Sequence, residues 1–214
     1  MILLDAGDAL FRVAQLPAEG PARAKEAEKA KLIVDTMGRL GYAGMAVGER
    51  DIALGVEELK KLAAAAKLPL LAANLEDSKG KKPFVERRVV PVGAVKVGVF
   101  AVSNGLEFQK AGLKVLHPLE VAQAQAAALR KEGAEFVVAL LHLDYDASLK
   151  LTNELKGVDF AIQSHDGRVS GTQLVGSTLL VAGGERGRQV GRAKFTLAGK
   201  LPYFDLSGAK EAKE

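Results

Sequence analysis

The chain has 214 residues, of which 48% are hydrophobic and 26% charged, a composition typical of a soluble globular protein and not of a disordered chain. It contains no Cys, which excludes disulfides and thiolate chemistry and leaves His and carboxylates to bind any metal. The formal net charge of +4 is mild, and the densest basic stretch, residues 79–88, flanks a loop with few aromatic residues. We therefore expect no nucleic-acid polymer as a partner, and no membrane span, since no apolar run reaches roughly 18 residues.

The first predicted element is a short strand that ends in two carboxylates. Residues 2–4 suit a buried strand, and Gly7 allows a tight turn that directs Asp5 and Asp8 beyond the end of that strand. We expect Asp5 to orient the turn. For Asp8 two interpretations stay open on these residues alone, a ligand at the strand exit or a member of an Asx turn.

Helical and strand-like patterns alternate along the rest of the chain. Apolar positions at helical spacing predict helices over residues 21–40, 56–67, 119–133 and 148–155. Short apolar or alternating runs predict strands over residues 44–47, 70–73, 89–92, 95–102, 136–141, 160–163, 179–182 and 192–197, with a hairpin between the third and fourth of these. We expect residues 144–146 to cap the helix that follows them. The pattern indicates an α/β fold with a mixed sheet.

Four side chains with metal-binding chemistry each follow the end of an apolar run: Asp8, Glu49, His142 and His165. Carboxylate oxygens combined with imidazole nitrogens suit a divalent transition metal, so these four strand ends can build one site if they converge on a single edge of the fold. The alternative is that each histidine is an ordinary hydrogen-bonded residue near the edge of a sheet.

The order and spacing of these motifs resemble the metallophosphoesterase domain of the 5'-nucleotidase family, a calcineurin-like phosphoesterase domain. The segments that carry the resemblance are DAGD at 5–8, YAGMAVGERD at 42–51, LPLLAANL at 68–75, VKVGVFAVSN at 95–104, the stretch 136–166 that contains both histidines, and GGERGRQVGRAKFTL at 183–197. The resemblance covers nearly the whole chain from Leu3 to about Leu197. It implies a four-layer αββα sandwich of two mixed sheets flanked by helices.

The resemblance also implies a set of ligands. Family members hydrolyse phosphate esters with two metals about 3.5–4 Å apart. By position in the motifs, Asp8 matches the carboxylate that bridges the two metals, and His142 matches a ligand of the second metal. His165 matches the first histidine of the family's Gly-His-x-His motif.

Other positions depart from the family pattern. The family's opening Asp-x-His, expected on a strand before Leu3, has no counterpart, and Gly167 stands where the second histidine of Gly-His-x-His is expected. In place of the Asn and His of the motif Gly-Asn-His-Glu, this chain has Glu49 and Arg50, and Ala53 stands in place of the supporting acid. The resemblance therefore implies at most one tightly bound divalent metal (Mn, Zn or Fe), or none.

Arg50 decides what chemistry the site can perform. A guanidinium stays charged near neutral pH and does not easily release a proton, so it stabilises negative charge instead of protonating a leaving group. Three arrangements stay open: Arg50 binds a phosphate bidentately, pairs with Glu49 or a neighbour, or fills the vacated metal space as a built-in cation. Arg186, in a glycine-rich loop, is a second candidate for phosphate binding.

Two functions follow as hypotheses. The first is a divergent 5'-nucleotidase-like metallophosphoesterase that hydrolyses a phosphate ester or nucleotide with at most one metal. The second is a catalytically inactive relative that binds a phosphorylated small molecule, or a protein partner of unspecified kind, through the same pocket.

The boundaries of the chain lead to further expectations. We expect residues 1–200 to form a single domain that lacks the family's first strand, followed by a charged tail over residues 201–214 and no C-terminal nucleotide-binding domain. If an export signal has been trimmed from the chain, we expect a periplasmic or extracytoplasmic protein, and otherwise a cytoplasmic one.

Overall fold

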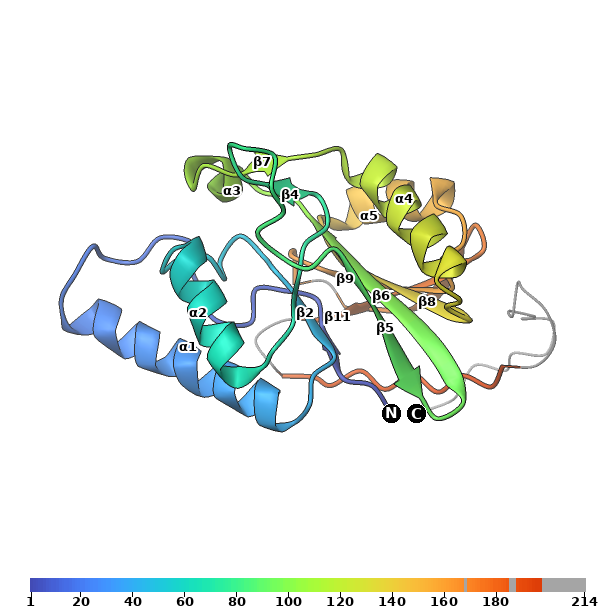
Figure 1. Ribbon diagram of the computed structural model, residues 1–214, viewed down its shortest axis with the longest axis horizontal. Helices are drawn as coiled ribbons and strands as arrows, with labels where there is room; N and C mark the ends of the chain where they lie inside the picture. The colour runs from blue at the N-terminus through green and yellow to red at the C-terminus, as the bar shows by residue number, and fades with distance from the viewer. Residues whose placement is uncertain (168, 185–187, 198–214) are drawn as a thin grey trace.

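Two β-sheets pack face to face and each carries helices on its outer side. This arrangement is seen in a computed structural model, which describes residues 1–167, 169–184 and 188–197 (Figure 1). The predicted tail at residues 201–214 lies outside the described residues. Contacts between the sheets involve the second strand of the small sheet and the central strands of the large one. The predicted α/β sandwich of four layers is therefore confirmed.

The small sheet contains three parallel strands in the order β1 (Leu4–Asp5), β2 (Gly44–Ala46) and β3 (Leu70–Leu71). Two helices, α1 (Pro21–Arg39) and α2 (Val56–Ala66), cover its outer face, and their apolar side chains form one core cluster with the loops of the small sheet (Figure 1). Each helix ends just before a strand begins. The connections that leave the strands therefore lie at the opposite edge of the sheet.

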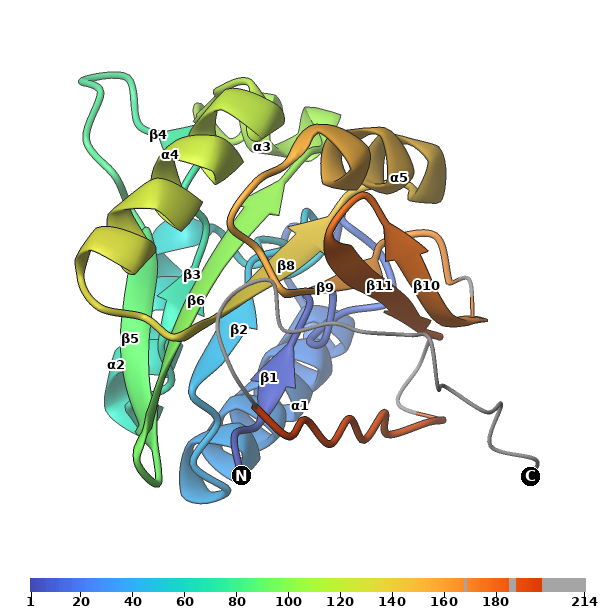
Figure 2. The same cartoon turned by 90° about the vertical axis from the view of Figure 1, so that its right-hand side faces the viewer.

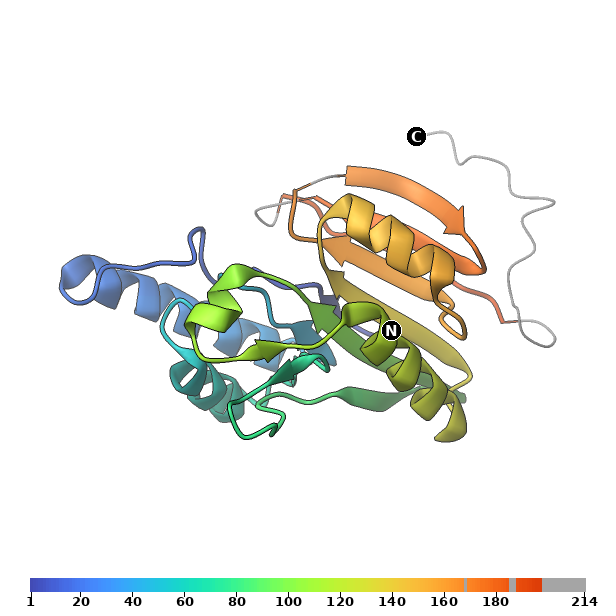
Figure 3. The same cartoon turned by 90° about the horizontal axis from the view of Figure 1, so that it is seen from above.

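The large sheet is mixed and contains six strands. In spatial order they are β10 (Val169–Val175), β11 (Thr178–Gly183), β9 (Phe160–Ser164), β8 (Phe136–His142), β6 (Val95–Ser103) and β5 (Arg87–Val92). The outermost pair at each edge is antiparallel, and the four inner strands are parallel. Helices α4 (Pro118–Lys131) and α5 (Tyr145–Glu154) lie across its outer face (Figures 2 and 3).

Strand β6 illustrates how the large sheet joins two core layers. Val97, Val99 and Ala101 point into the cluster between the sheets, whereas Phe100 and Val102 pack in the cluster under α4 and α5. Because successive side chains of a strand point to opposite faces, a strand covered on both sides becomes continuously apolar. The same alternation holds in β8, and it explains why residues 136–141 form an uninterrupted apolar run in the sequence.

The predicted hairpin is confirmed, and residues 144–146 cap α5 as expected. Asp144 is the N-cap of that helix, and its carboxylate accepts a hydrogen bond of 2.8 Å from the Ala147 N–H. The helix therefore begins at Tyr145, three residues before the predicted start. The short elements α3 (Leu106–Lys110), β4 (Leu75–Glu76) and β7 (Lys114–Val115), together with β10, were not predicted.

The predicted strand over residues 192–197 is wrong, because these residues form no strand. They cross the inner face of the large sheet instead, and the Phe195 ring packs against Phe136 and Phe160 with centroid separations of 4.8 and 5.0 Å (Figure 2). The small sheet leaves this part of the inner face uncovered, and the apolar side chain of Phe195 closes it without pairing its backbone to a strand.

Within the described residues, no helix combines the length and the apolar character that crossing a membrane requires.

Replacing Phe195 with Ala is expected to destabilise the fold. The change removes two aromatic contacts and part of the inner core, so we expect the free energy of unfolding in urea to fall by about 2 kcal/mol. The matched control is Val190→Ala in the same segment, because Val190 is 92% exposed and its truncation should leave the unfolding free energy unchanged. Equal effects of the two changes would contradict the assigned packing.

Candidate metal centre

The ends of four parallel strands bring together the four side chains predicted as metal ligands. Asp8 lies in the loop after β1, Glu49 in the loop after β2, His142 is the last residue of β8, and His165 follows β9 (Figure 2). One ligand atom from each residue can be chosen so that all four atoms lie within 4.8 Å of one another. Both sheets thus contribute to one cluster, as the strand-exit pattern indicated.

The backbone around the cluster adopts conformations that most residues avoid. Asp8 and His165 have φ angles of 61° and 101°, in the left-handed region that is costly for residues with a Cβ atom. Gly48 is required by close approach, because a Cβ atom there would lie 2.2 Å from Oδ1 of Asp8 and 2.7 Å from Cε1 of His142. The turn around Gly7, with φ of 100°, is held by Asp5, whose carboxylate accepts a 2.8 Å hydrogen bond from the Gly7 N–H. The expected turn-orienting role of Asp5 is confirmed.

The buried ring of His142 has an oxygen acceptor at each nitrogen. Its Nδ1 lies 3.0 Å from the Ala6 carbonyl oxygen and 2.9 Å from Oγ of Ser164, while its Nε2 lies 2.7 Å from Oε2 of Glu49 and 3.6 Å from Oδ2 of Asp8. A carbonyl oxygen can only accept, so Nδ1 carries a proton. Nε2 then faces carboxylates, and it needs either a second proton or a cation between itself and these oxygens.

Electrostatics in the cluster favour the protonated imidazole when no metal is bound. Burial acts to lower the pKa of His142, but the hydrogen bond to Glu49 and the charge of Asp8 outweigh it and raise that pKa above its ordinary value. Burial acts to raise the pKa of Glu49, yet its close contacts with the imidazoles of His142 and His165 hold it far below its usual range. The contact with Glu49 also raises the pKa of His165, whereas burial raises that of Asp8.

The donor set fits one divalent metal. Two of its atoms, Oδ2 of Asp8 and Nδ1 of His165, are buried and have no hydrogen bond of good geometry, although each lies 3.2 Å from a charged partner, Arg50 and Glu49 respectively. Tetrahedral coordination with bonds of about 2.1 Å separates ligand atoms by about 3.4 Å. Three contacts within the cluster, of 2.7, 3.2 and 3.6 Å, are close to that spacing, and all four chosen ligand atoms lie within 4.8 Å of one another. The described residues contain no second cluster of three or more metal-binding side chains.

Arg50 pairs with Asp8 and not with Glu49. Its Nε lies 3.2 Å from Oδ2 of Asp8, and its backbone N–H donates a 2.9 Å hydrogen bond to Oδ1 of the same carboxylate. The side chain is 40% exposed, so part of it reaches solvent. A guanidinium in this position can offer two parallel N–H groups to an incoming phosphate while it stays beside Asp8.

The remaining predicted positions add no ligand to the cluster among the residues that the structure describes. Arg186 lies outside the described residues, and Arg188, in the same glycine-rich stretch, is exposed. Gly167 has a φ of 68° and offers no ligand where the family pattern has its second histidine.

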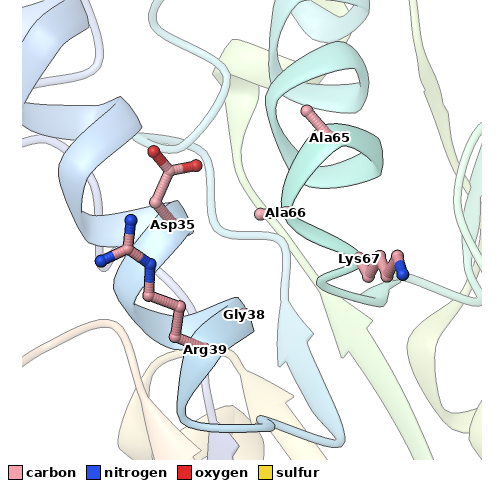
Figure 4. Close-up of a pocket in the computed structure, with 6 residues that line it drawn as sticks. All are labelled: Asp35, Gly38, Arg39, Ala65, Ala66 and Lys67. Atoms are coloured by element: carbon pink, nitrogen blue, oxygen red, sulfur yellow. The ribbon is translucent and has the colours of Figure 1, made fainter.

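A pocket between the last turns of α1 and α2 lies away from the cluster (Figure 4). Its lining residues are Asp35, Gly38, Arg39, Ala65, Ala66 and Lys67. Because both helices end just before a strand begins, this pocket lies at the edge of the small sheet opposite the loops that carry Asp8 and Glu49. The two helices are in close contact there, since a Cβ atom on Gly38 would lie 2.1 Å from the Ala66 carbonyl oxygen. The pocket contains none of the predicted site residues, and we assign it no part in the chemistry.

Two residues of the site were not recognised from the sequence. Ser164 donates a hydrogen bond of 2.5 Å from Oγ to the Ala6 carbonyl oxygen and contacts Nδ1 of His142. Asp51 is fully buried, and burial together with the nearby charge of Asp8 raises its pKa to about 7. The sequence signal for Asp51 is its place two residues after Glu49, where the motif Gly-Asn-His-Glu has its acid, but this place does not reveal that the side chain turns inward.

The raised pKa of His142 predicts how the stability of metal-free protein depends on pH. The proton on Nε2 contributes stability below the ordinary imidazole pKa of about 6.5, and this contribution is lost as the pH rises through the raised pKa. We expect the melting temperature in a chelator to fall between pH 6 and pH 9. Added Zn²⁺ or Mn²⁺ should raise it more at pH 8 than at pH 6, because metal and proton compete for Nε2.

Two variants identify the group responsible. In His142→Gln, the melting temperature should depend less on pH and should rise less when metal is added. In His117→Gln, at an exposed histidine remote in sequence from the site, both dependences should match wild type. A melting temperature that is independent of both pH and metal would contradict the assigned role of His142.

The amino-acid sequence was compared with those of known proteins. No family model matches the chain. Snake venom 5'-nucleotidase from Naja atra is 24% identical over 192 residues, which are 84% of this chain and 33% of the relative. The chain thus spans about a third of the length of this curated relative.

Solved structures agree on the fold. The 5'-nucleotidase precursor from Thermus thermophilus is 25% identical with a TM-score of 0.66, covering 86% of this chain and 39% of its own. The sulfate thiohydrolase SoxB from the same organism is 23% identical with a TM-score of 0.69, and the match covers 86% of this chain and 33% of SoxB. The calcineurin-like phosphoesterase YfkN from Bacillus subtilis is 17% identical with a TM-score of 0.70, covering 86% and 67%. In sequence and fold the chain is therefore similar to 5'-nucleotidase-like metallophosphoesterase domains, and the resemblance drawn from its motifs is confirmed.

Proposed function

We propose that this chain is a divergent phosphoesterase that acts on a phosphorylated small molecule with at most one tightly bound divalent metal. The observation that carries the proposal is the convergence of Asp8, Glu49, His142 and His165 within 4.8 Å, with the Arg50 guanidinium against the same Asp8 carboxylate. A metal ligand set and an anion-binding group thus lie side by side. The 5'-nucleotidase relatives make a nucleotide one candidate substrate.

Each residue has a defined part in this proposal. The two carboxylates and two imidazoles would hold the metal, which when bound supplies Lewis-acid polarisation of a phosphoryl oxygen. Arg50 binds two phosphate oxygens through its guanidinium, and its fixed charge stabilises the negative charge that develops on them. The hydrogen bond from Nδ1 of His142 to the Ala6 carbonyl oxygen keeps Nε2 aimed at the cluster.

Protonation of the leaving group is the step that this chain supports least. Arg50 cannot act as a general acid, and the imidazoles of His142 and His165 are already engaged with Glu49. The leaving alkoxide must therefore take its proton from water or depart unprotonated. We infer that the protein favours esters with acidic leaving groups, such as aryl phosphates, over alkyl phosphates.

A second candidate function, binding without turnover, is favoured by the Arg50–Asp8 ion pair. The guanidinium lies 3.2 Å from the Asp8 oxygen that the family resemblance assigns to bridging two metals. A built-in cation there compensates the carboxylate and still attracts a phosphate. The two candidates share the ligand class, a phosphorylated small molecule, and differ in whether the ester bond is cleaved.

Metal stoichiometry tests the proposed site. Purified protein dialysed against Mn²⁺ or Zn²⁺ should retain no more than one equivalent by elemental analysis, because only four donors converge among the residues that the structure describes. Glu49→Gln should reduce that amount, since it removes a carboxylate charge that contacts both histidines. Two tightly bound equivalents would contradict the one-metal proposal, and complete absence of binding at pH 8 would overturn it.

Restoring the family residues tests the chemistry. The double variant Glu49→Asn with Arg50→His returns a group able to donate a proton, so we expect turnover of a generic aryl phosphate to rise about 100-fold, the lower end of the contribution of a positioned general acid. The single variant Arg50→Lys is the matched control, because it keeps the charge without an acidic proton near pH 7. An unchanged rate in metal-loaded double variant would show that proton donation does not limit the reaction, and phosphate binding without turnover by every variant would favour the second candidate.

A further inference from the structure

We propose that Asp51 is a positioning residue that holds the two acidic metal ligands in their binding orientation without touching the metal; this inference rests on the proposed metal site. Its Oδ2 accepts 2.8 Å hydrogen bonds from the N–H groups of both Asp8 and Gly48, and its Oδ1 accepts one of 3.1 Å from Leu10. One buried carboxylate therefore binds the loop after β1 to the loop after β2.

Two of the backbone N–H groups that donate to Asp51 belong to residues at or next to the metal ligands, and so they fix how the ligand side chains are oriented. The Asp8 N–H belongs to a ligand itself, and the Gly48 N–H belongs to the residue that precedes Glu49. The Asp8 backbone is in the left-handed region with φ of 61°, a conformation that needs outside support. Asp51 supplies that support with charge-assisted hydrogen bonds on both sides of Asp8, to its own N–H and to that of Leu10.

Asp51 is itself held in place. Its own N–H donates a 3.2 Å hydrogen bond to the Gly48 carbonyl oxygen, which closes a tight turn over residues 48–51. The side chain is fully buried, so water cannot replace its oxygens as acceptors. Without Asp51, three N–H groups of the two loops would lose their acceptor, and a buried donor without an acceptor destabilises the loop that carries it.

Other side chains do not reproduce this arrangement. Asn has one acceptor oxygen, and its NH₂ group would face at least one of the backbone donors that Asp51 now satisfies. Glu keeps both oxygens but adds a methylene at a site with no exposed surface. The site therefore requires two acceptor oxygens on a side chain as short as that of aspartate.

The test compares Asp51→Asn with Asp159→Asn by Mn²⁺ titration, with free Mn²⁺ followed by electron paramagnetic resonance. Asp159 is a suitable control because it is also buried, accepts a 2.7 Å hydrogen bond from the Val137 N–H and pairs with Arg130 at the end of β8 opposite His142. Both variants should melt at lower temperature. Only Asp51→Asn should weaken Mn²⁺ binding, by about tenfold or more, while Asp159→Asn stays within about twofold of wild type.

A second readout separates this inference from the proposed function. In metal-free protein the ¹⁵N resonances of the His142 and His165 rings should shift in Asp51→Asn and not in Asp159→Asn, because only the first change moves the carboxylates that face these rings. Wild type that binds no Mn²⁺ would overturn the proposed function, and the ring resonances would then decide on Asp51. If Asp51→Asn does not fold, Asp51→Glu takes its place in both experiments, with a smaller loss expected. Unchanged Mn²⁺ affinity with unchanged ring resonances would overturn the role of Asp51.

Discussion

Buried negative charge that must be compensated is the constraint on which this site depends. Asp8 and Glu49 lie in one desolvated cluster, where two carboxylates repel each other and burial opposes the ionisation of both. The imidazoliums of His142 and His165, the Arg50 guanidinium and a divalent metal are the cations that can meet this demand. The chain places the first three around the carboxylates from separate loops. Metal binding is then an exchange of cations in a site that already requires positive charge.

The sequence predicted those features of the fold that depend on neighbouring residues in the chain. Alternating or continuous apolar runs identified the strands of both sheets except β10, and the polar residues that follow these runs include all four members of the cluster. The segment 192–197 shows the limit, because its apolar residues pack against the core but its pattern does not show whether the backbone finds a strand to pair with. Asp51 shows another limit, since a carboxylate that follows Glu49 and Arg50 looks solvent-exposed until the two loops that donate to it are brought together.

Arg50 connects the structure to both candidate functions. Of the arrangements left open by the sequence, pairing with the neighbouring Asp8 is the one observed, and the side chain stays 40% exposed beside it. Both candidate functions use this exposed cation to bind a phosphate, and they differ in whether the ester bond is then cleaved. The fold and the sequence similarity relate the chain to 5'-nucleotidase-like metallophosphoesterase domains. Its substrate, its turnover and its location, extracytoplasmic if an export signal has been trimmed and otherwise cytoplasmic, stay proposals.

The left-handed backbone at Asp8 and His165 lowers the stability of the fold, because both residues carry a Cβ atom. Glycine would adopt both conformations at lower cost, by about 1 kcal/mol or more at each position. Retaining side chains there therefore lowers the stability of the fold, which is the usual signature of positions kept for their chemistry. Lys67 also has a positive φ, of 56°, at the end of α2, so this conformation alone does not mark function; at Asp8 and His165 it coincides with two members of the proposed metal cluster.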